Sequence, residues 1–215
     1  MNTLHYIFDP MCGWCYAAAP LIEAAKCADI SIVLHGGGML TGAHRRPITA
    51  QWREHVMPHD RRIAQLTKQP FGEAYFEGLL RDSSVVLDSE PPTTAILAAE
   101  AIAGRGLDML HRVQRAHYVE GLRIADHDVL QQLAMEIGLD ANTFDAYFSR
   151  LVGEVTETHI RESRAWLART GGQGFPTLAQ AQDDGSLTRI ELSQWLGRPT
   201  DFVATLQQQH AFRQQ

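Results

Sequence analysis

The chain has 215 residues, of which 45% are hydrophobic and 20% are charged, a composition typical of a globular domain with a substantial core. Its formal net charge of -6, with basic residues scattered along the chain, argues against a nucleic-acid-binding surface and against binding to anionic membranes. No segment approaches the roughly 18 consecutive apolar residues of a membrane span, so no membrane partner is expected.

The beginning of the chain predicts a strand, a helix and a second strand. Residues 3–8 form a short apolar run, residues 12–27 have one apolar helical face, and residues 30–35 are rich in β-branched side chains. The run Gly36-Gly37-Gly38 ends the second strand and lacks the spacing and lysine of a phosphate loop, so we interpret it as a close-packed turn. These lengths indicate a βαβ unit with two parallel strands.

The middle of the chain, from about residue 47 to residue 170, has helical periodicity throughout. One apolar stripe follows the i, i+3, i+4, i+7 spacing and consists of Phe144, Tyr147, Phe148 and Leu151. Ser89 before Glu90-Pro91-Pro92 is typical of a helix start. We therefore expect an all-helical insertion over residues 41–171.

Strand character returns near the end of the chain. Residues 176–180 and 187–192 predict two strands, joined by the turn signal Asp183-Asp184-Gly185-Ser186. Residues 200–210 predict a closing helix. The full order is βαβ, helical block, ββα, an α/β fold whose first half covers residues 1–40 and whose second half covers residues 172–215.

The motif Cys12-Gly13-Trp14-Cys15 lies between the first strand and the first helix. A helix N-terminus stabilises a thiolate placed there, so Cys12 is the expected reactive sulfur, and Cys15, one turn further on, could close a disulfide with it. The alternatives are half of a zinc site or an inert pair. Zinc needs about four ligands, and the only other cysteine is Cys27, so we expect redox chemistry and no metal site.

Two further residues near the motif have simple explanations. We expect Cys27 to be a small buried hydrophobic residue. Asp9 could assist proton transfer, but aspartate before proline is an ordinary turn signal, which favours an exposed turn residue.

The 10 histidines suggest no metal site either. His55 and His59 are four residues apart, but Pro58 lies between them and is expected to prevent a helical pair. His111 and His117 are six residues apart and would lie on different helical faces. Surface histidines are the simpler interpretation.

The order of elements and three local features resemble the DsbA family, which has a thioredoxin-like fold with a helical insertion. The features are the Cys12–Cys15 motif, Pro20 in the first helix, where thioredoxin-like proteins often carry a kinking proline, and Phe175-Pro176-Thr177, where this family carries its cis-proline. The nearest likeness is to the cytoplasmic, FrnE-like branch, described as predicted protein-disulfide isomerases.

Further runs resemble that branch: Asp9-Pro10-Met11, His35-Gly36-Gly37-Gly38-Met39, Pro70-Phe71-Gly72, Ser89-Glu90-Pro91-Pro92 and Gly171 to Thr177. The chain also departs from better-known relatives. Gly13-Trp14 differs from the dipeptides of thioredoxin and DsbA, and this dipeptide tunes the redox potential. Tyr6 stands where DsbA-type proteins place a carboxylate.

The resemblance implies a thiol–disulfide oxidoreductase or protein-disulfide isomerase. Cys12 would form a mixed disulfide with substrate and Cys15 would resolve it. Phe175 and Pro176 would bind the substrate, and Trp14 would either border the site or pack against the helical block. The substrate would be a thiol- or disulfide-containing protein or small molecule, with no cofactor beyond glutathione as a co-substrate.

Two other functions remain open from the sequence. Kappa-class glutathione transferases and 2-hydroxychromene-2-carboxylate isomerases resemble this architecture and use glutathione, although they usually lack a paired CxxC. A module that holds unfolded chains would not need Cys12. The motif arrives by residue 12 with no basic signal-peptide region before it, so we expect a cytoplasmic protein, and many relatives form homodimers.

Overall fold

The computed structural model describes residues 3–182 and 185–213. Its main sheet has the strand order β2-β1-β5-β6, formed by Ser31–Gly36, Thr3–Phe8, Thr177–Ala181 and Leu187–Ile190. Strand β1 pairs in parallel with β2 and antiparallel with β5, so that Tyr6 lies between Leu34 and Leu178. The predicted βαβ unit and the predicted hairpin are therefore both present, and the pairing of β1 with β5 joins them into one sheet.

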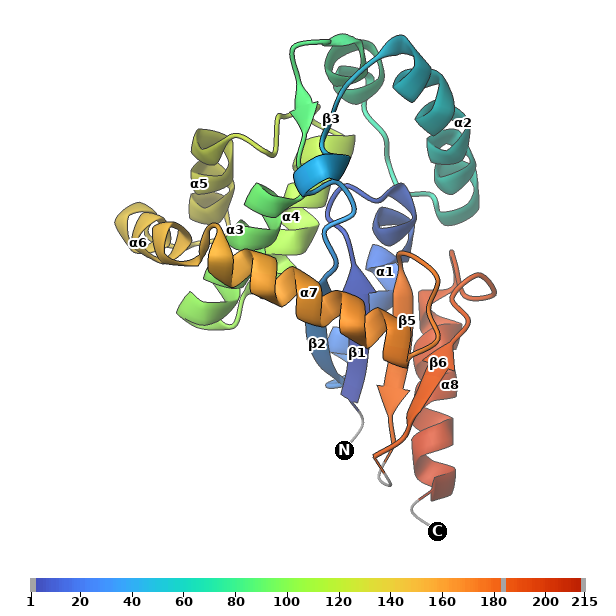
Figure 1. Ribbon diagram of the computed structural model, residues 1–215. Coiled ribbons are helices and arrows are strands. Elements are labelled where there is room, and N and C mark those ends of the chain that lie inside the picture. The colour runs from blue at the N-terminus through green and yellow to red at the C-terminus, as the bar shows by residue number, and fades with distance from the viewer. Residues whose placement is uncertain (1–2, 183–184, 214–215) are drawn as a thin grey trace.

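The two faces of the sheet carry different helices, as Figure 1 shows. Helix α7 (Glu154–Arg169) crosses one face, where the Trp166 ring stacks on His5 with 4.1 Å between centroids. Helices α1 (Gly13–Cys27) and α8 (Pro199–Arg213) pack together on the other face, where the Tyr6 hydroxyl donates to the Cys15 carbonyl. Neighbouring residues of a strand point to opposite faces, which explains why His5 and Tyr6 contact different helices.

The middle of the chain forms the helices α2 (Ala50–Thr67), α3 (Glu90–Ala103), α4 (Gly106–Tyr118), α5 (His127–Glu136) and α6 (Ala141–Leu151). The short turn η1 (Gly42–His44) precedes α2, and η2 (Ala74–Gly78) and η3 (Leu79–Arg81) lie between α2 and α3. In Figure 1, α3 to α6 gather beside the sheet and α2 stands apart from them, on the side of α1 and α8.

The insertion is not entirely helical, which corrects the sequence-based expectation. Strands β3 (Arg46–Pro47) and β4 (Val86–Leu87) form a small antiparallel pair. A further backbone hydrogen bond from Ile48 to Val85 extends it. Two residues per strand are too few to show an alternating pattern in the sequence.

One continuous core joins the sheet and the insertion. Leu21 and Ile22 of α1 are fully buried and belong to the apolar helical face predicted within residues 12–27, and Pro20 lies inside the same helix. Phe144 and Phe148 of the predicted stripe are also buried. Within residues 3–182 and 185–213, no helix is long and apolar enough to cross a lipid bilayer.

The hairpin near the end of the chain was predicted with a turn at residues 183–186. Its strands pair antiparallel, with Leu178 opposite Ile190. Asp183 and Asp184 of the turn signal lie outside the described residues.

Candidate active site

The two cysteines of the motif occupy different environments at the start of α1. Cys12 is the N-cap residue with an extended backbone, and its carbonyl accepts from the Cys15 and Tyr16 amides at 3.0 and 3.1 Å. Cys12 is 6% exposed and Cys15 is 0% exposed, and neither forms a disulfide in this structure. The positive end of the helix therefore faces the more accessible sulfur.

Cys15 is held in its thiol form by its surroundings. Burial raises the pKa of Cys15 well above its usual value, and the neighbouring Cys12 sulfur raises it further. The Asp9 amide donates to Cys15 Sγ at 3.4 Å. Burial also raises the pKa of Tyr6 well above its usual value, so Tyr6 adds no negative charge beneath the motif.

The loop before β5 brings a second segment to Cys12. The Phe175–Pro176 peptide bond is cis, as the resemblance implied. Cys12 Sγ lies 3.5 Å from the Phe175 carbonyl oxygen and can donate to it. The Phe175 ring packs on Gly37, where an added Cβ would lie 2.2 Å from Phe175 Cε1. The glycine run is thus a close-packed turn, as predicted, and it leaves room for Phe175 beside Cys12 Sγ.

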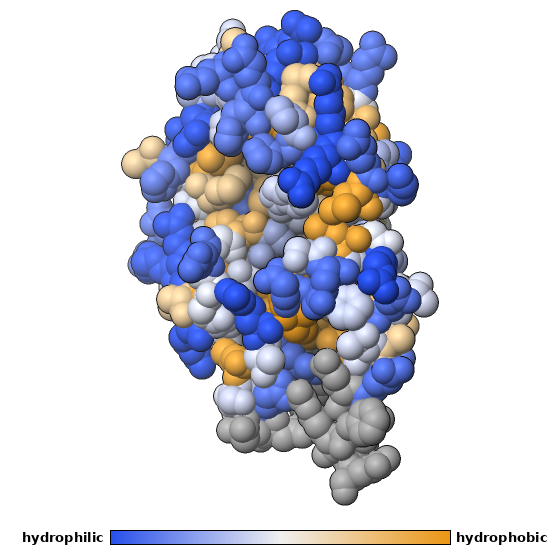
Figure 2. Space-filling view, turned by 90° about the vertical axis from the view of Figure 1, so that its right-hand side faces the viewer, coloured by the Kyte–Doolittle hydropathy of each residue, from blue (hydrophilic) through white to orange (hydrophobic). Residues whose placement is uncertain are grey.

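A cavity of about 300 Å³ opens beside Cys12, between the start of α1 and the insertion. The half-buried Trp14 lines it, together with Trp52 of α2 and Tyr118 of α4. Figure 2 views the side of the molecule that carries α2 and α8, and its largely hydrophilic surface shows apolar side chains in a central band. The cavity can therefore receive an apolar or aromatic part of a substrate within reach of Cys12.

Two histidines predicted to lie apart are brought together at this cavity. Helix α2 continues through Pro58, and the rings of His55 and His59 lie 5.4 Å apart on its exposed side. The expectation that Pro58 prevents a helical pair was wrong, because a proline removes one backbone hydrogen bond while the flanking turns continue the helix. His117, expected at the surface, is 5% exposed and lines the same cavity.

Asp9 is fully buried, which corrects the expectation of an exposed turn residue. Its carboxylate accepts from the Met11 amide at 2.8 Å, from the Ser89 hydroxyl at 3.0 Å and from the Met39 amide. Burial raises the pKa of Asp9, and these three donors act against that effect. Asp9 therefore joins the segment before Cys12 to the glycine run and to the start of α3.

Cys27 is exposed, not buried as expected, and its sulfur lies 3.6 Å from Glu23 Oε1. Among the described residues, no group of three or more histidine, cysteine, aspartate or glutamate side chains could hold a metal ion.

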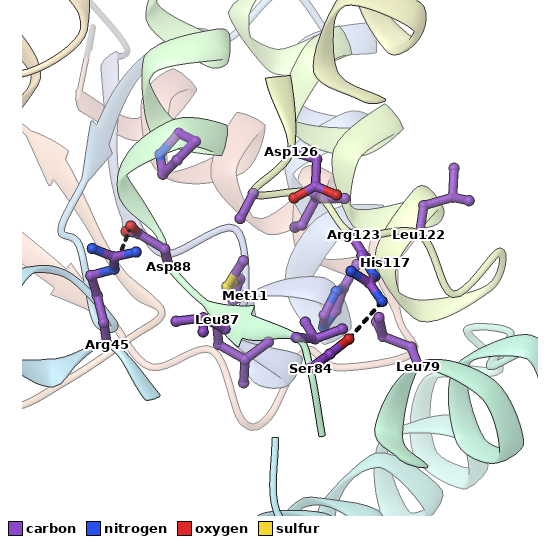
Figure 3. Close-up of a pocket in the computed structure, with 15 residues that line it drawn as sticks. Met11, Arg45, Leu79, Ser84, Leu87, Asp88, His117, Leu122, Arg123 and Asp126 are labelled. Carbon is purple, nitrogen blue, oxygen red and sulfur yellow. Dashed lines mark hydrogen bonds and ion pairs between the residues drawn. The ribbon is translucent and has the colours of Figure 1, made fainter. Parts of the chain in front are cut away.

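A second cavity of about 270 Å³ lies behind the first, and Met11, Leu87 and His117 line both. Figure 3 shows Met11 in its centre, between an Arg45–Asp88 ion pair of 2.7 Å and Arg123, which donates to Ser84 at 2.9 Å. Arg45 and Asp88 are thus paired with each other, and Arg123 also pairs with Asp82 outside the cavity lining. Met11, directly before Cys12, lies between this second cavity and Cys12 Sγ.

A model of the DSBA-like thioredoxin domain matches residues 3–202. The chain belongs to the DsbA-like thioredoxin family. The predicted α/β fold with its insertion is thereby confirmed, and the protein is a thiol–disulfide oxidoreductase.

Solved structures of DsbA-like proteins include two that are similar along the whole chain. The cytosolic disulfide reductase DsbM from Pseudomonas aeruginosa has 50% sequence identity and a TM-score of 0.91, over 98% of this chain and 99% of that chain. The structure of DsbM with GSH has 50% identity and a TM-score of 0.89, over 97% of this chain and 99% of that chain.

A structure of 2-hydroxychromene-2-carboxylate isomerase has 15% identity and a TM-score of 0.60, over 97% of this chain and 98% of that chain. This likeness concerns the fold alone. A search of curated protein sequences gave no significant match.

Proposed function

We propose that this protein is a disulfide reductase that uses glutathione to return its Cys12–Cys15 pair to the dithiol form. The observation that carries the proposal is the asymmetry of the two sulfurs. Cys12 borders the cavity and lies 3.5 Å from the Phe175 carbonyl, whereas Cys15 is 0% exposed. A substrate disulfide can reach one sulfur of the pair, and the other is held behind it.

The reaction follows from these positions. The Cys12 thiolate attacks a substrate disulfide, forms a mixed disulfide and releases one substrate thiolate. Cys15 then loses its proton, attacks Cys12 Sγ and releases the second substrate thiolate. The pair has given two electrons to the substrate. Phe175 and Pro176 bind the substrate backbone beside Cys12, and Trp14 contacts its apolar part.

Basic groups beside the cavity support an anionic small thiol such as glutathione. A groove of about 440 Å³ meets the cavity at Trp52 and His55, and its lining has no carboxylate but includes His44, Arg46 and Arg45, whose guanidinium is paired with Asp88 at 2.7 Å. The Arg46 guanidinium lies 5.0 Å from the centre of the Trp52 ring. A protein with a net charge of -6 thus presents positive charge at this border, where carboxylates of a ligand would be attracted.

The DsbM structures support both parts of the proposal, since DsbM is a cytosolic disulfide reductase and one of its structures contains GSH. We extend this to a cytoplasmic location for the present chain. Glutathione conjugation or isomerisation on the same fold is the weaker candidate, because the intact Cys12–Cys15 pair is not needed for it.

The proposal is tested by titrating the oxidised and reduced forms of the pair in glutathione buffers and counting free thiols by mass. A reversible two-electron transition near the roughly -270 mV of thioredoxin is expected, and a potential near the roughly -120 mV of DsbA would contradict a reductase. Cys12→Ser should abolish the transition. Cys27→Ser is the matched control and should leave it unchanged.

A further inference from the structure

Asp60 of α2 is an acidic residue at the redox site to which the reaction above gives no role. It is 3% exposed, and one carboxylate oxygen accepts from the Tyr75 hydroxyl at 2.9 Å. The other oxygen faces the motif, because a Cβ added to Gly13 would lie 2.8 Å from Asp60 Oδ1. Asp60 and Cys12 line the same cavity, so this carboxylate faces the space that a substrate thiol must enter.

Gly13 makes this approach possible. Any side chain at position 13 would meet Asp60 Oδ1 at 2.8 Å and Ile63 Cδ1 at 3.2 Å. The residue next to the reactive cysteine therefore has to be small for the insertion to bring its carboxylate so close. This contact couples α2 to the CxxC motif.

The surroundings of Asp60 give its carboxylate a pKa suited to accepting a proton at neutral pH. Burial raises its pKa to about 6, and the hydrogen bond from Tyr75 opposes this rise. Tyr118 and Tyr75 have pKa values raised by burial, and burial lowers the pKa of His117 to about 4, so these three neighbours are uncharged at neutral pH. From α1, the Cys12 thiol faces the same cavity.

Two histidines on α2 itself, His55 and His59, also line this cavity, on its exposed side. They are open to solvent, whereas Asp60 is enclosed. A buried carboxylate that ionises near pH 6 is a suitable proton acceptor at neutral pH, because a general base works best with a pKa near the working pH.

We propose that Asp60 is the general base that takes the proton from the glutathione thiol when the oxidised Cys12–Cys15 pair is reduced. This inference rests on the proposed function. The thiol hydrogen goes to an Asp60 carboxylate oxygen, and the thiol sulfur forms a bond with Cys12 Sγ. The Cys12–Cys15 bond breaks, and its electron pair goes to Cys15.

The remaining steps balance the reaction. Cys15 takes up one proton from solvent, and Asp60 releases its proton to solvent. A second glutathione thiol then gives its proton to solvent, attacks the glutathione sulfur of the mixed disulfide and releases the Cys12 thiolate, so two thiols are oxidised for each pair reduced.

The test is the pH dependence of a single turnover, in which oxidised protein is mixed with glutathione and the reduction of the pair is followed by tryptophan fluorescence. With Asp60 as base, the rate of wild type is nearly constant between about pH 6.5 and 7 and falls tenfold per pH unit below about pH 6, while direct attack by the glutathione thiolate adds to the rate at higher pH. Asp60→Asn keeps an acceptor for Tyr75 but cannot titrate. Its rate should follow the thiolate fraction over the whole range and be at least about tenfold lower at pH 6.5.

A second variant separates this role from a structural one. Tyr75→Phe removes the hydrogen bond that lowers the pKa of Asp60, so the acidic limb of the profile should move to higher pH. If Asp60→Asn does not fold, the inference is overturned when the reduction rate of Tyr75→Phe falls at the same pH as that of wild type. If wild type reacts with glutathione but Asp60→Asn shows the same profile, the inference alone fails. If wild type does not react with glutathione at all, the proposed function fails.

Discussion

The role of Asp9 as a structural junction predicts a large loss of stability for Asp9→Ala. The variant removes the acceptor of the Met11 and Met39 amides and of the Ser89 hydroxyl, all in a site where Asp9 is 0% exposed. Each buried amide left without a partner costs about 1–3 kcal/mol. Part of that cost is offset, because the variant also removes a buried carboxyl group. We expect a net loss of about 2–4 kcal/mol in the free energy of unfolding.

The assay is urea unfolding followed by circular dichroism, with Ser89→Ala as the matched control. The control removes one of the three donors to Asp9 and the acceptor of the Leu40 amide, and should cost about 1–2 kcal/mol. Asp9→Ala should also change the rate at which Cys12 reacts with an alkylating agent, because the segment before Cys12 loses its anchor. If Asp9→Ala costs no more than Ser89→Ala, the reasoning is refuted.

Three further predictions follow from burial and close contacts. Burial lowers the pKa of His117 from 6.5 to about 4, so only the unfolded chain binds its proton in that interval. The free energy of unfolding should fall by up to about 3 kcal/mol as the pH falls from 6.5 to 4. Urea unfolding of His117→Gln should show no such pH dependence, and the same pH dependence in both proteins would contradict this. For Asp60, whose pKa is raised from 3.8 to about 6, the folded protein holds its proton more tightly, so stability falls as the pH rises through this interval. As the pH rises from 4 to 6, the free energy of unfolding of Asp60→Asn should increase relative to that of wild type by up to about 3 kcal/mol. A difference between the two proteins that does not change with pH would argue against the raised pKa of Asp60. Gly37→Ala would place a Cβ 2.2 Å from Phe175 Cε1 and should cost about 1–3 kcal/mol and slow disulfide reduction, whereas Gly174→Ala, with no atom within 4 Å of its added Cβ, should change neither.

The two halves of the fold and the redox motif could be predicted because their signals are local. Strand-length apolar runs, a CxxC before a helix and a proline before a strand each lie within a few residues. The exposure of Cys27 was also open to prediction. It lies two residues after the buried Ala25, about 200° around the helix, and so on the opposite face.

Asp9 could not be placed from the sequence, because its environment comes from distant segments. An aspartate before a proline gives the same turn signal whether it is exposed or buried. Its partners Met39 and Ser89 are 30 and 80 residues away in the chain. The position of Asp60 could not be predicted for the same reason, since only the packing of α2 against the start of α1 brings it to Gly13.

The central claim, that Cys12 attacks and Cys15 resolves, is tested most directly by trapping. Cys15→Ser and Cys12→Ser are prepared in a Cys27→Ser background, because Cys27 is exposed and would react itself. Each is treated with glutathione disulfide and analysed by intact mass and peptide mapping. We expect a stable glutathione adduct on Cys12 in the Cys15→Ser protein and little or none on Cys15 in the Cys12→Ser protein. Equal labelling of the two proteins, or labelling of Cys15 alone, would contradict the account.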